Sequence, residues 1–558
     1  MTFPGIDDST LCFVPLGGSG EIGMNLNLYG IGGKWLMVDL GVTFGDYRLP
    51  GIDIVMPDIR FIEERKNDLV GLVLTHAHED HFGAVAHLWP RLKCPVYATP
   101  FTAELLRGKL IEADLLDQVP LFEVPLGGRI DLPPFDLGFI TLTHSIPEPN
   151  ALSIRTAAGT VLHTGDWKID PDPQLGEVTD HQALSALGDD GVLAMICDST
   201  NVLEDGESGS EAGVRAALTE VVGKCRGRVA VTAFASNVAR LASIIAAATA
   251  AGRQPVLVGR SIKRAITAAR AAGYLADVPG LRDESDCAGL AAGECLYICT
   301  GSQGESRGAM ARIASGEHRE VRLDAGDTVI FSSRRIPGND LTIHALYNTL
   351  AARGITVITD SEAAVHVSGH PCRDELAKMY QWVRPHIAIP VHGEPRHLAE
   401  HGEFATLMQV PHCLVPENGS IIALDEDGPR LIGKAPAGRL VIDGDQLVDA
   451  EGPSVVGRRR LLHNGQASVS LVVNGDGGLL DRPRVSLLGV PWEGDQADLI
   501  DLVEEAVITA HDRLSRRQRD NDDILAEAMR IAARRALRQS CAKKPLTVVH
   551  VHRIGARP

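Results

Sequence analysis

The sequence has no apolar run that approaches the roughly 20 residues of a membrane-spanning helix, so we expect no membrane anchor. Its first residues, 1–4, lack a basic segment followed by an apolar one, which predicts that there is no signal peptide. The ten cysteines are scattered and form no CxxC pair, which argues against a disulfide framework or a zinc ribbon. These absences predict a protein of the reducing cytoplasm.

The chain also lacks an excess of basic residues, because its formal net charge is −18. Affinity for a phosphate backbone comes mainly from Lys and Arg, so this balance argues against a protein that coats nucleic acid broadly. It does not exclude a nuclease with a narrow, locally basic channel, since metal ions in a cleft offset a locally acidic site. We find no internal repeat and no low-complexity segment.

What the chain does have is length and alternating apolar segments. Its 558 residues predict two to four domains, and 44% hydrophobic with 23% charged residues is typical of globular proteins. Up to about residue 209, short apolar strands end in polar residues. From 210 to 369, Ala-rich helices such as 239–251 alternate with strands such as 328–331, which predicts a doubly wound insert with a parallel sheet. After it we expect a segment over 370–445, a linker over 446–460 and a small α/β domain over 461–558.

The most specific pattern is the stretch from Leu74 to His81, which reads L-T-H-A-H-E-D-H directly after an apolar strand. His76 and His78 point the same way from an extended segment and suit one metal ion. Asp80 and His81 lie on the following turn and suit a second ion. No packing reason places three imidazoles and a carboxylate together, so the pattern predicts a metal-dependent hydrolase.

Other strand ends offer the remaining ligands. His144 could complete a set with His76 and His78, Asp166 could bridge the two ions, and His392 could close the second site. This ligand type favours zinc, two ions per subunit, with manganese as an alternative. A water between two such ions becomes a hydroxide nucleophile at neutral pH. A single His at a strand end is more often structural, and we expect His163 to be of that kind.

Further motifs in a fixed order carry a family resemblance. The chain resembles the ribonuclease J family, in the β-CASP branch of the metallo-β-lactamase superfamily, over most of its length. The motifs are Gly17–Asn25, Asp198–Asn201, Phe234–Asn237, Thr300–Glu305, Ile336–Asn339, His366–His370 and His392–Glu394.

The resemblance implies an αββα metallo-β-lactamase sandwich in two parts (1–209 and 370–445), an inserted β-CASP α/β domain (210–369) and the small C-terminal domain. It also implies RNA in the cleft between the first two domains, 5′-to-3′ exonuclease activity that prefers 5′-monophosphate ends, and endonuclease activity in RNA maturation and decay. Single-stranded RNA is the implied partner, and a homodimer or homotetramer formed through the C-terminal domain is the implied assembly.

The resemblance assigns residues as well. It implies a first metal site of His76, His78, His144 and Asp166, and a second of Asp80, His81, Asp166 and His392. Asp39 then supports the His loop from behind, and Asp198 orients His370, the implied general acid for the leaving 3′-oxygen. We expect Asp80, His81, Asp198 and His370 to carry the catalysis. Ser236, His366 and Ser368 fall where the family's 5′-phosphate pocket is built.

The chain departs from the family at Arg334 and Arg335, where small residues are common. These two arginines could serve the RNA channel or could be a solvated face. Two rival functions fit the sequence less well. A small-molecule metallo-hydrolase such as a lactonase needs no long channel, and a non-enzymatic scaffold in an RNA-decay complex needs no complete ligand set.

Overall fold

The protein is described by a computed structural model that covers residues 9–278, 280–287, 289–305, 308–336 and 339–555. The chain forms two compact units, one of 1–43 with 56–438 and one of 44–55 with 439–558. Among the described residues, no helix combines the length and the apolar character that a membrane span requires.

The larger unit contains two stacked sheets that share one apolar core. Every residue of β1 and β2 is buried, as expected of strands that are covered on both faces. The eight-stranded sheet runs in the order β23 (Gly428–Lys434), β22 (Ser420–Asp425), β1 (Leu11–Gly17), β2 (Leu26–Ile31), β3 (Lys34–Val38), β6 (Leu69–Val73), β7 (Val96–Ala98), β8 (Leu121–Glu123). The seven-stranded sheet runs in the order β21 (His412–Cys413), β20 (Ile387–Val391), β13 (Ala194–Asp198), β12 (Gly159–His163), β11 (Asn150–Thr156), β10 (Phe135–Thr141), β9 (Arg129–Leu132).

Helices cover the outer faces of these sheets and complete an αββα sandwich. Apolar residues of α5, α11 and α12 form a second core with the outer face of the seven-stranded sheet. Helix α4 contacts β7 and β8 in the other sheet. The helices of this sandwich are α1 (Arg60–Glu63), α2 (Glu79–Phe82), α3 (Val85–Leu92), α4 (Pro100–Glu112), α5 (His181–Asp190), α11 (Arg373–Val383) and α12 (Pro395–Leu407).

Parallel pairing across the insert brings distant strand ends together. Strand β13 pairs in parallel with β20, and Asp198 lies opposite Val391 in the register. The residue that follows Val391 is His392, so Asp198 and His392 reach the same edge of the sheet. In the other sheet β3 pairs in parallel with β6, with Val38 opposite Val73, so Asp39 lies beside the start of the His loop.

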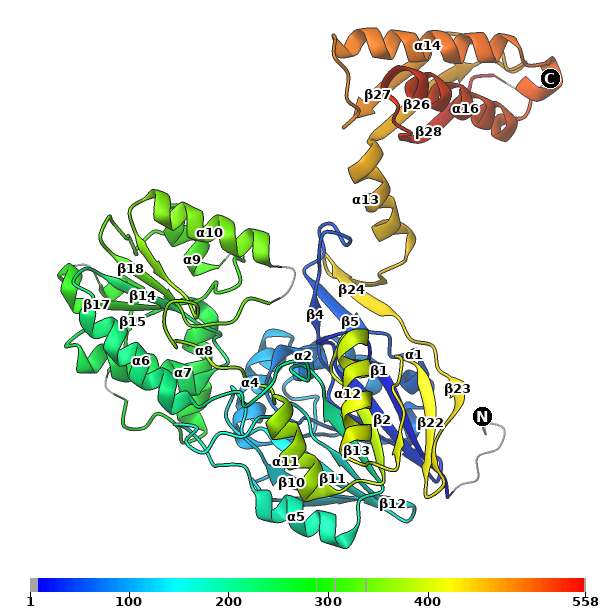
Figure 1. The fold of residues 1–558 in the computed structure, drawn as a ribbon. Coiled ribbons are helices and arrows are strands. Elements are labelled where there is room, and N and C mark those ends of the chain that lie inside the picture. The colour runs from blue at the N-terminus through cyan, green and yellow to red at the C-terminus, as the bar shows by residue number, and fades with distance from the viewer. Residues whose placement is uncertain (1–8, 279, 288, 306–307, 337–338, 556–558) are drawn as a thin grey trace. The chain divides into compact units, whose positions relative to one another are not determined.

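The insert between β13 and α11 is a doubly wound α/β domain, as the sequence predicts. Helices α9 and α10 lie on one side of its parallel sheet and α6, α7 and α8 on the other (Figure 1). Its strands run in the order β16 (Arg282–Asp283), β15 (Gln254–Val258), β17 (Cys295–Cys299), β14 (Val229–Thr232), β18 (Thr328–Phe331), β19 (Thr356–Ile358). Its helices are α6 (Glu211–Lys224), α7 (Val238–Ala250), α8 (Arg260–Ala271), α9 (Ala309–Ala314) and α10 (Asp340–Ala352).

The two chain segments that connect the insert to the sandwich are tied together by one buried carboxylate. Glu375 is fully buried and accepts hydrogen bonds from the backbone N–H groups of Ser208 (2.8 Å), Cys372 (2.8 Å) and Ile169 (2.9 Å), and from the Ser208 hydroxyl (2.8 Å). Loss of this acceptor would leave several buried donors without a partner.

The smaller unit ends in a sheet of order β27 (Arg484–Leu488), β26 (Gln466–Val473), β28 (Leu546–Arg553), which shares a core with α14 (Gln496–Asp512) and α16 (Asp522–Cys541). The segment predicted as a linker, 446–460, holds β25 (Gln446–Asp449) and the first part of α13 (Pro453–Asn464). The unit also contains most of a four-stranded sheet with β24 (Arg439–Asp443), β5 (Ile54–Pro57) and β4 (Thr43–Phe44), and the short helix α15 (Arg516–Arg519).

Candidate active site

The H-x-H-x-D-H stretch forms the loop between β6 and α2. His78 has extended backbone angles (φ −79°, ψ 146°) and directly precedes the first turn of α2. The extended segment turns His76 and His78 to one side, so His76 Nε2 lies 3.1 Å from His78 Nδ1. The helical turn that follows carries Asp80 and His81 onto the same cluster.

A first group of ligand atoms consists of His76, His78, His144 and Asp166, and these atoms lie within 4.8 Å of one another. His144 follows β10 and places its Nε2 atom 3.0 Å from His78 Nδ1. The Asp166 Oδ2 atom lies 3.8 Å from Nε2 of both His76 and His144. The structure therefore brings together the four side chains predicted for one ion.

A second group consists of Asp80, His81, Asp166 and His392. Asp166 Oδ2 lies 3.1 Å from His81 Nε2, and Asp80 Oδ2 lies 3.2 Å from His392 Nε2. Asp166 belongs to both groups, which is the position expected of a carboxylate that bridges two ions. All these side chains except part of Asp80 and His78 are buried.

The two groups fit divalent ions by three criteria. Two nitrogens that bind a tetrahedral ion at about 2.0–2.1 Å are about 3.3 Å apart, close to the 3.0 and 3.1 Å separations around His78. The Asp166 Oδ1 atom is buried and has no hydrogen-bond partner among the described residues, which is costly for a carboxylate unless a cation neutralises it. Imidazole and carboxylate ligands suit zinc or manganese.

The ionisation of the histidines also agrees with metal binding. Burial lowers the pKa of His76 and His144 well below 6.5 and that of His78 to about 4, so these rings are neutral at neutral pH, as metal ligands must be. For His392, burial lowers the pKa, but the attraction of Asp166 and the other nearby carboxylates outweighs it and raises the pKa to about 10. When no cation is bound, His392 therefore carries a proton that balances the charge of the nearby carboxylates.

Hydrogen bonds behind the cluster fix which nitrogen of each ring faces it. The buried Asp39 accepts a hydrogen bond from His81 Nδ1 at 2.7 Å, which leaves Nε2 for an ion. Asp39 also accepts from the Thr75 backbone N–H at 2.8 Å and from its hydroxyl at 2.9 Å. The carbonyl of Gly369 accepts from His144 Nδ1 in the same way. Asp39 thus lies behind the His loop and contacts it through Thr75 and His81.

Two of these residues have a left-handed backbone. Asp39 has φ +63° and His392 has φ +53°, a region that costs a non-glycine residue about 1–3 kcal/mol. Both are held there by the neighbouring strands, since the Asp39 N–H donates to the Val73 carbonyl and the His392 N–H to that of Gly18. Two of the eleven left-handed non-glycine residues in the described part of the chain thus lie at the cluster.

Sequence reasoning missed two supporting side chains. The Thr200 hydroxyl lies 2.8 Å from His392 Nδ1 and 2.7 Å from Asp198 Oδ1, so it links these two residues. Asn25 Nδ2 lies 3.1 Å from both the Asp80 carbonyl and His81 Nε2. Both residues belong to motifs already visible in the sequence, Asp198–Asn201 and Gly17–Asn25, but nothing in those motifs says which side chain faces the site.

At the edge of the cluster Asp198 and His370 form a pair. His370 Nδ1 lies 2.8 Å from Asp198 Oδ2, and this hydrogen bond leaves His370 Nε2 free. Burial lowers the pKa of His370, but the negative charge and hydrogen bond of Asp198 outweigh it, so the pKa is raised above 6.5. The His370 side chain is 21% exposed, whereas Asp198 is buried. The pair therefore offers a proton at the open side of the cluster.

Three residues were predicted for a phosphate pocket. Ser236 lies on one chain segment and His366 and Ser368 on another, and Arg240 contacts both segments. Arg240 is fully buried, donates to Glu211 from two nitrogens (2.7 and 2.9 Å), and places Nη1 3.2 Å from His366 Nδ1. Its backbone N–H donates to Asn237, which follows Ser236. Ser368 accepts from the His370 backbone N–H at 3.2 Å. Burial, then the charges of Arg240 and Arg334, lower the pKa of His366.

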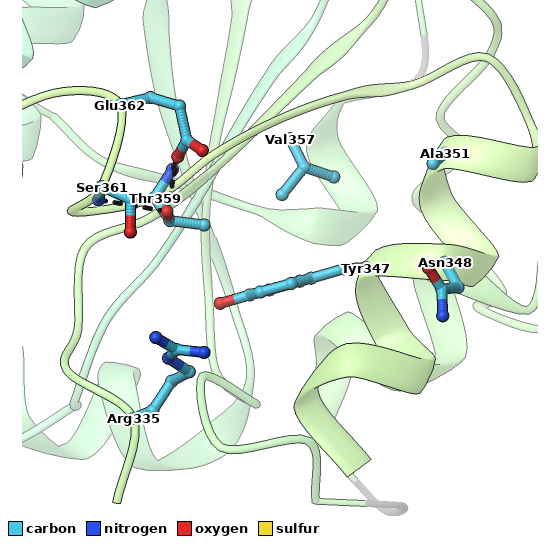
Figure 2. Close-up of a pocket in the computed structure, with 8 residues that line it drawn as sticks. All are labelled: Arg335, Tyr347, Asn348, Ala351, Val357, Thr359, Ser361 and Glu362. Carbon is cyan, nitrogen blue, oxygen red and sulfur yellow. Dashed lines mark hydrogen bonds between the residues drawn. The ribbon is translucent and has the colours of Figure 1, made fainter. Parts of the chain in front are cut away.

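The two arginines of the 334–335 pair differ in their surroundings. Arg335 lines a hollow of about 440 Å³ on the insert, together with Tyr347 and Glu362 (Figure 2), and its Nη1 atom lies 3.0 Å from His344 Nε2. Arg334 instead contacts the sandwich, with Nη2 2.7 Å from Glu204 and Nη1 3.4 Å from Asn201.

His163 is structural as predicted, because it is buried and its Nδ1 lies 2.9 Å from the Tyr29 hydroxyl.

Comparison with known protein families gives four matches along the chain. They are the metallo-beta-lactamase superfamily over 25–188, the ribonuclease J beta-CASP domain over 226–350, the Zn-dependent metallo-hydrolase RNA specificity domain over 354–408 and the ribonuclease J C-terminal domain over 454–554.

Individual proteins agree with these matches. The chain is 44% identical to a ribonuclease J of Sinorhizobium meliloti over 98% of both chains, and 40% identical to a ribonuclease J of Mycolicibacterium smegmatis over 82% of both chains. A solved structure from Enterococcus faecalis, of a protein of unknown function, matches with a TM-score of 0.52 at 16% identity, covering 75% of this chain and all of that one. That likeness supports the fold alone.

Proposed function

This chain belongs to the ribonuclease J family of metal-dependent ribonucleases, and we propose that it degrades single-stranded RNA from the 5′ end, prefers a 5′-monophosphate, and also cuts internally. The observation that carries this proposal is the Asp198–His370 pair beside the two ligand groups. Cleavage of a phosphodiester expels an alkoxide oxygen that needs a proton, and His370 is positioned to supply one.

We assign the metal ligands as follows. His76, His78, His144 and Asp166 would hold one ion, and Asp80, His81, Asp166 and His392 the other. Bound ions of this kind supply charge neutralisation on phosphoryl oxygens and an activated water as nucleophile. Zinc is the favoured metal because the ligand set is rich in imidazole, and manganese is the alternative.

The chain's own residues complete the reaction. His370 Nδ1 is engaged by Asp198, so the ring presents Nε2 to the substrate and can donate its proton to the leaving 3′-oxygen. Asp198 keeps the ring oriented and favours its protonated form. Thr200 joins Asp198 to His392, so the proton donor and one metal ligand are held by the same hydrogen-bonded chain.

The 5′-end preference is supported by the segment around His366. Ser236, His366 and Ser368 would form the pocket for a terminal phosphate, near the positive charge of Arg240. A pocket that holds a monophosphate at a fixed distance from the scissile bond releases nucleotides one at a time. Entry of RNA without that end would give internal cuts.

The proposal extends to domains and assembly. We place the metallo-β-lactamase domain at 1–209 and 370–445, the β-CASP domain at 210–369 and the C-terminal domain from about 461. We propose that the C-terminal domain joins subunits into a dimer or tetramer and that the protein acts in the cytoplasm, in RNA maturation and decay.

Digestion of end-labelled RNA with defined 5′ groups tests the proposal. With a 3′ label, we expect 5′-monophosphorylated RNA to disappear faster than 5′-hydroxyl or 5′-triphosphate RNA of the same sequence. With a 5′ label, we expect mononucleotides as the main product. Equal rates on all three ends would remove the pocket assignment. Internal fragments alone would leave an endonuclease without the exonuclease activity.

A further inference from the structure

We propose that Arg334 binds a phosphate group of the RNA and that Glu204 holds its guanidinium in place until RNA arrives. This inference rests on the proposed function, because it adds a substrate contact to the same site.

The backbone at Arg334 is fixed by a buried glutamine. Gln303 is 6% exposed, and its side-chain Nε2 donates to the Arg334 carbonyl at 2.9 Å. Its Oε1 accepts from the Ile336 backbone N–H at 2.9 Å. A guanidinium on a braced loop loses less conformational freedom on binding than one on a free loop. Arg334 is therefore better prepared for a ligand than a surface arginine usually is.

The guanidinium lies one side chain away from the proton donor. Its Nη1 is 3.4 Å from the Asn201 Oδ1 atom, and Asn201 Nδ2 donates to the Ser368 hydroxyl at 2.7 Å and to the His370 carbonyl at 3.0 Å. Asn201 itself is 6% exposed, so it bridges the exposed Arg334 guanidinium and the His370 segment from a buried position. Arg334 thus lies beside the segment that carries His370.

The contact with Glu204 is of the kind that a phosphate can replace. The two side chains are 50% and 51% exposed, and ion pairs so exposed are worth about 0–1 kcal/mol. A phosphate offers more negative charge and accepts two parallel hydrogen bonds from a guanidinium. The exchange would move Glu204 aside and leave Arg334 on the RNA. Without RNA, the Glu204 carboxylate neutralises the exposed guanidinium of Arg334, in a chain whose net charge is −18.

Arg335 is the matched control, because it has the same charge and lies next in the chain but lines the hollow with Tyr347 (Figure 2). Glu207 is the matched control for Glu204. It lies in the same segment and is similarly exposed, but it pairs with Lys378 at 2.6 Å. Each substitution of interest can therefore be compared with one that changes the net charge equally.

The test measures kcat and KM of the metal-loaded full-length enzyme on single-stranded RNA with 5′-monophosphate or 5′-hydroxyl ends. We expect Arg334→Ala to raise KM about tenfold with kcat nearly unchanged, as loss of one charge-assisted hydrogen bond predicts. Arg335→Ala should change KM less than twofold. Glu204→Gln should lower KM by up to about fivefold, more than Glu207→Gln does, and this gain should vanish in the Arg334→Ala background.

The two RNA ends identify the phosphate. A penalty from Arg334→Ala on the 5′-monophosphate substrate alone would assign the terminal phosphate, and an equal penalty on both would assign a backbone phosphate. The dependence of log KM on log salt should also become shallower by about 0.7 in Arg334→Ala, the loss of one phosphate contact on a single strand.

The inference is overturned if Arg334→Ala and Arg335→Ala behave alike, or if Glu204→Gln gives its full gain without Arg334. A merely structural role would lower the melting temperature and kcat together and leave the salt slope unchanged. Failure of the proposed function would give a different result, since the wild-type enzyme would then not degrade these RNAs or would not distinguish their 5′ ends.

Discussion

Replacement of Asp39 by Asn should weaken one metal site and spare the other. Asparagine is nearly the same size as aspartate and tolerates the left-handed backbone at this position (φ +63°). It replaces one acceptor oxygen by an NH₂ group, however. Asp39 accepts from three donors, His81 Nδ1, the Thr75 N–H and the Thr75 hydroxyl, and an amide cannot serve all three. One buried donor then faces another donor.

The magnitude follows from those contacts. Loss of a hydrogen bond to a charged group costs about 1.5–3 kcal/mol of stability, so unfolding should occur at lower denaturant concentration. His81 can relieve the clash by moving its proton to Nε2, the nitrogen that faces Asp166. Nε2 would then no longer be free to bind an ion, and loss of such an orienting partner typically lowers metal affinity about 10–100-fold. Asp39→Ala should be worse by about 1 kcal/mol more, because alanine disfavours the left-handed region.

The assay is titration of metal-stripped protein with Zn²⁺ against a competing chelator. Wild-type protein should bind two equivalents tightly, and Asp39→Asn should keep one tight equivalent and weaken the other, with activity restored in part by excess Zn²⁺. Asp114→Asn is the matched control, because Asp114 also has a left-handed backbone (φ +56°) but is exposed, just after the end of α4. Two unchanged tight equivalents in Asp39→Asn would refute the role given to Asp39.

Four further changes test other parts of the structure. Asp80→Ala together with His81→Ala should abolish hydrolysis while RNA binding, measured by a shift assay, survives; retained nuclease activity would contradict the two-ion site. His370→Ala should lower kcat by about 10²–10⁴ with little change in KM, and an RNA with a better leaving group should recover part of the loss. His401 is buried, and burial lowers its pKa to about 4, so between about pH 6.5 and 4 the folded state binds fewer protons than the unfolded state. The free energy of unfolding should therefore fall by up to about 3 kcal/mol as the pH falls from about 6.5 to 4. Urea unfolding of metal-stripped protein should show a flatter pH dependence in His401→Gln than in the wild type. Arg240→Ala should destabilise the protein by about 3–5 kcal/mol because Glu211 is left buried without its partner, whereas Arg240→Met with Glu211→Leu should recover most of that loss.

Much of the architecture could be predicted because its signals are local. Strand β18 has the predicted bounds, 328–331, since it is an apolar run that ends at a turn. The parallel insert was predicted from the alternation of such runs with Ala-rich helices. Boundaries without a strong local signal were less certain. Helix α16 begins after Asn521, whose side chain accepts from two backbone N–H groups, although the neighbouring Asp522 offers an equally suitable cap.

The candidate site was predictable only in part for the same reason. The spacing of His76, His78, Asp80 and His81 is a local pattern. His144, Asp166 and His392 follow β10, β12 and β20 of the seven-stranded sheet, so they reach the cluster through the sheet and not through local spacing, and their assignment depended on the family motifs. The contacts of Arg334 with Glu204 and Asn201 are set by how two loops meet, and no spacing in the sequence encodes them.

The order of strands along the chain has a consequence for synthesis on the ribosome. Strand β20 completes the pairing of β13, and His392 directly follows it, so the last metal ligand is made after about seven-tenths of the protein. The β-CASP domain can fold before that point, because all its strands precede residue 359. A nascent chain therefore completes its β-CASP domain first and its metal-ligand cluster last. Incomplete chains released early would be unable to cleave the message that encodes them.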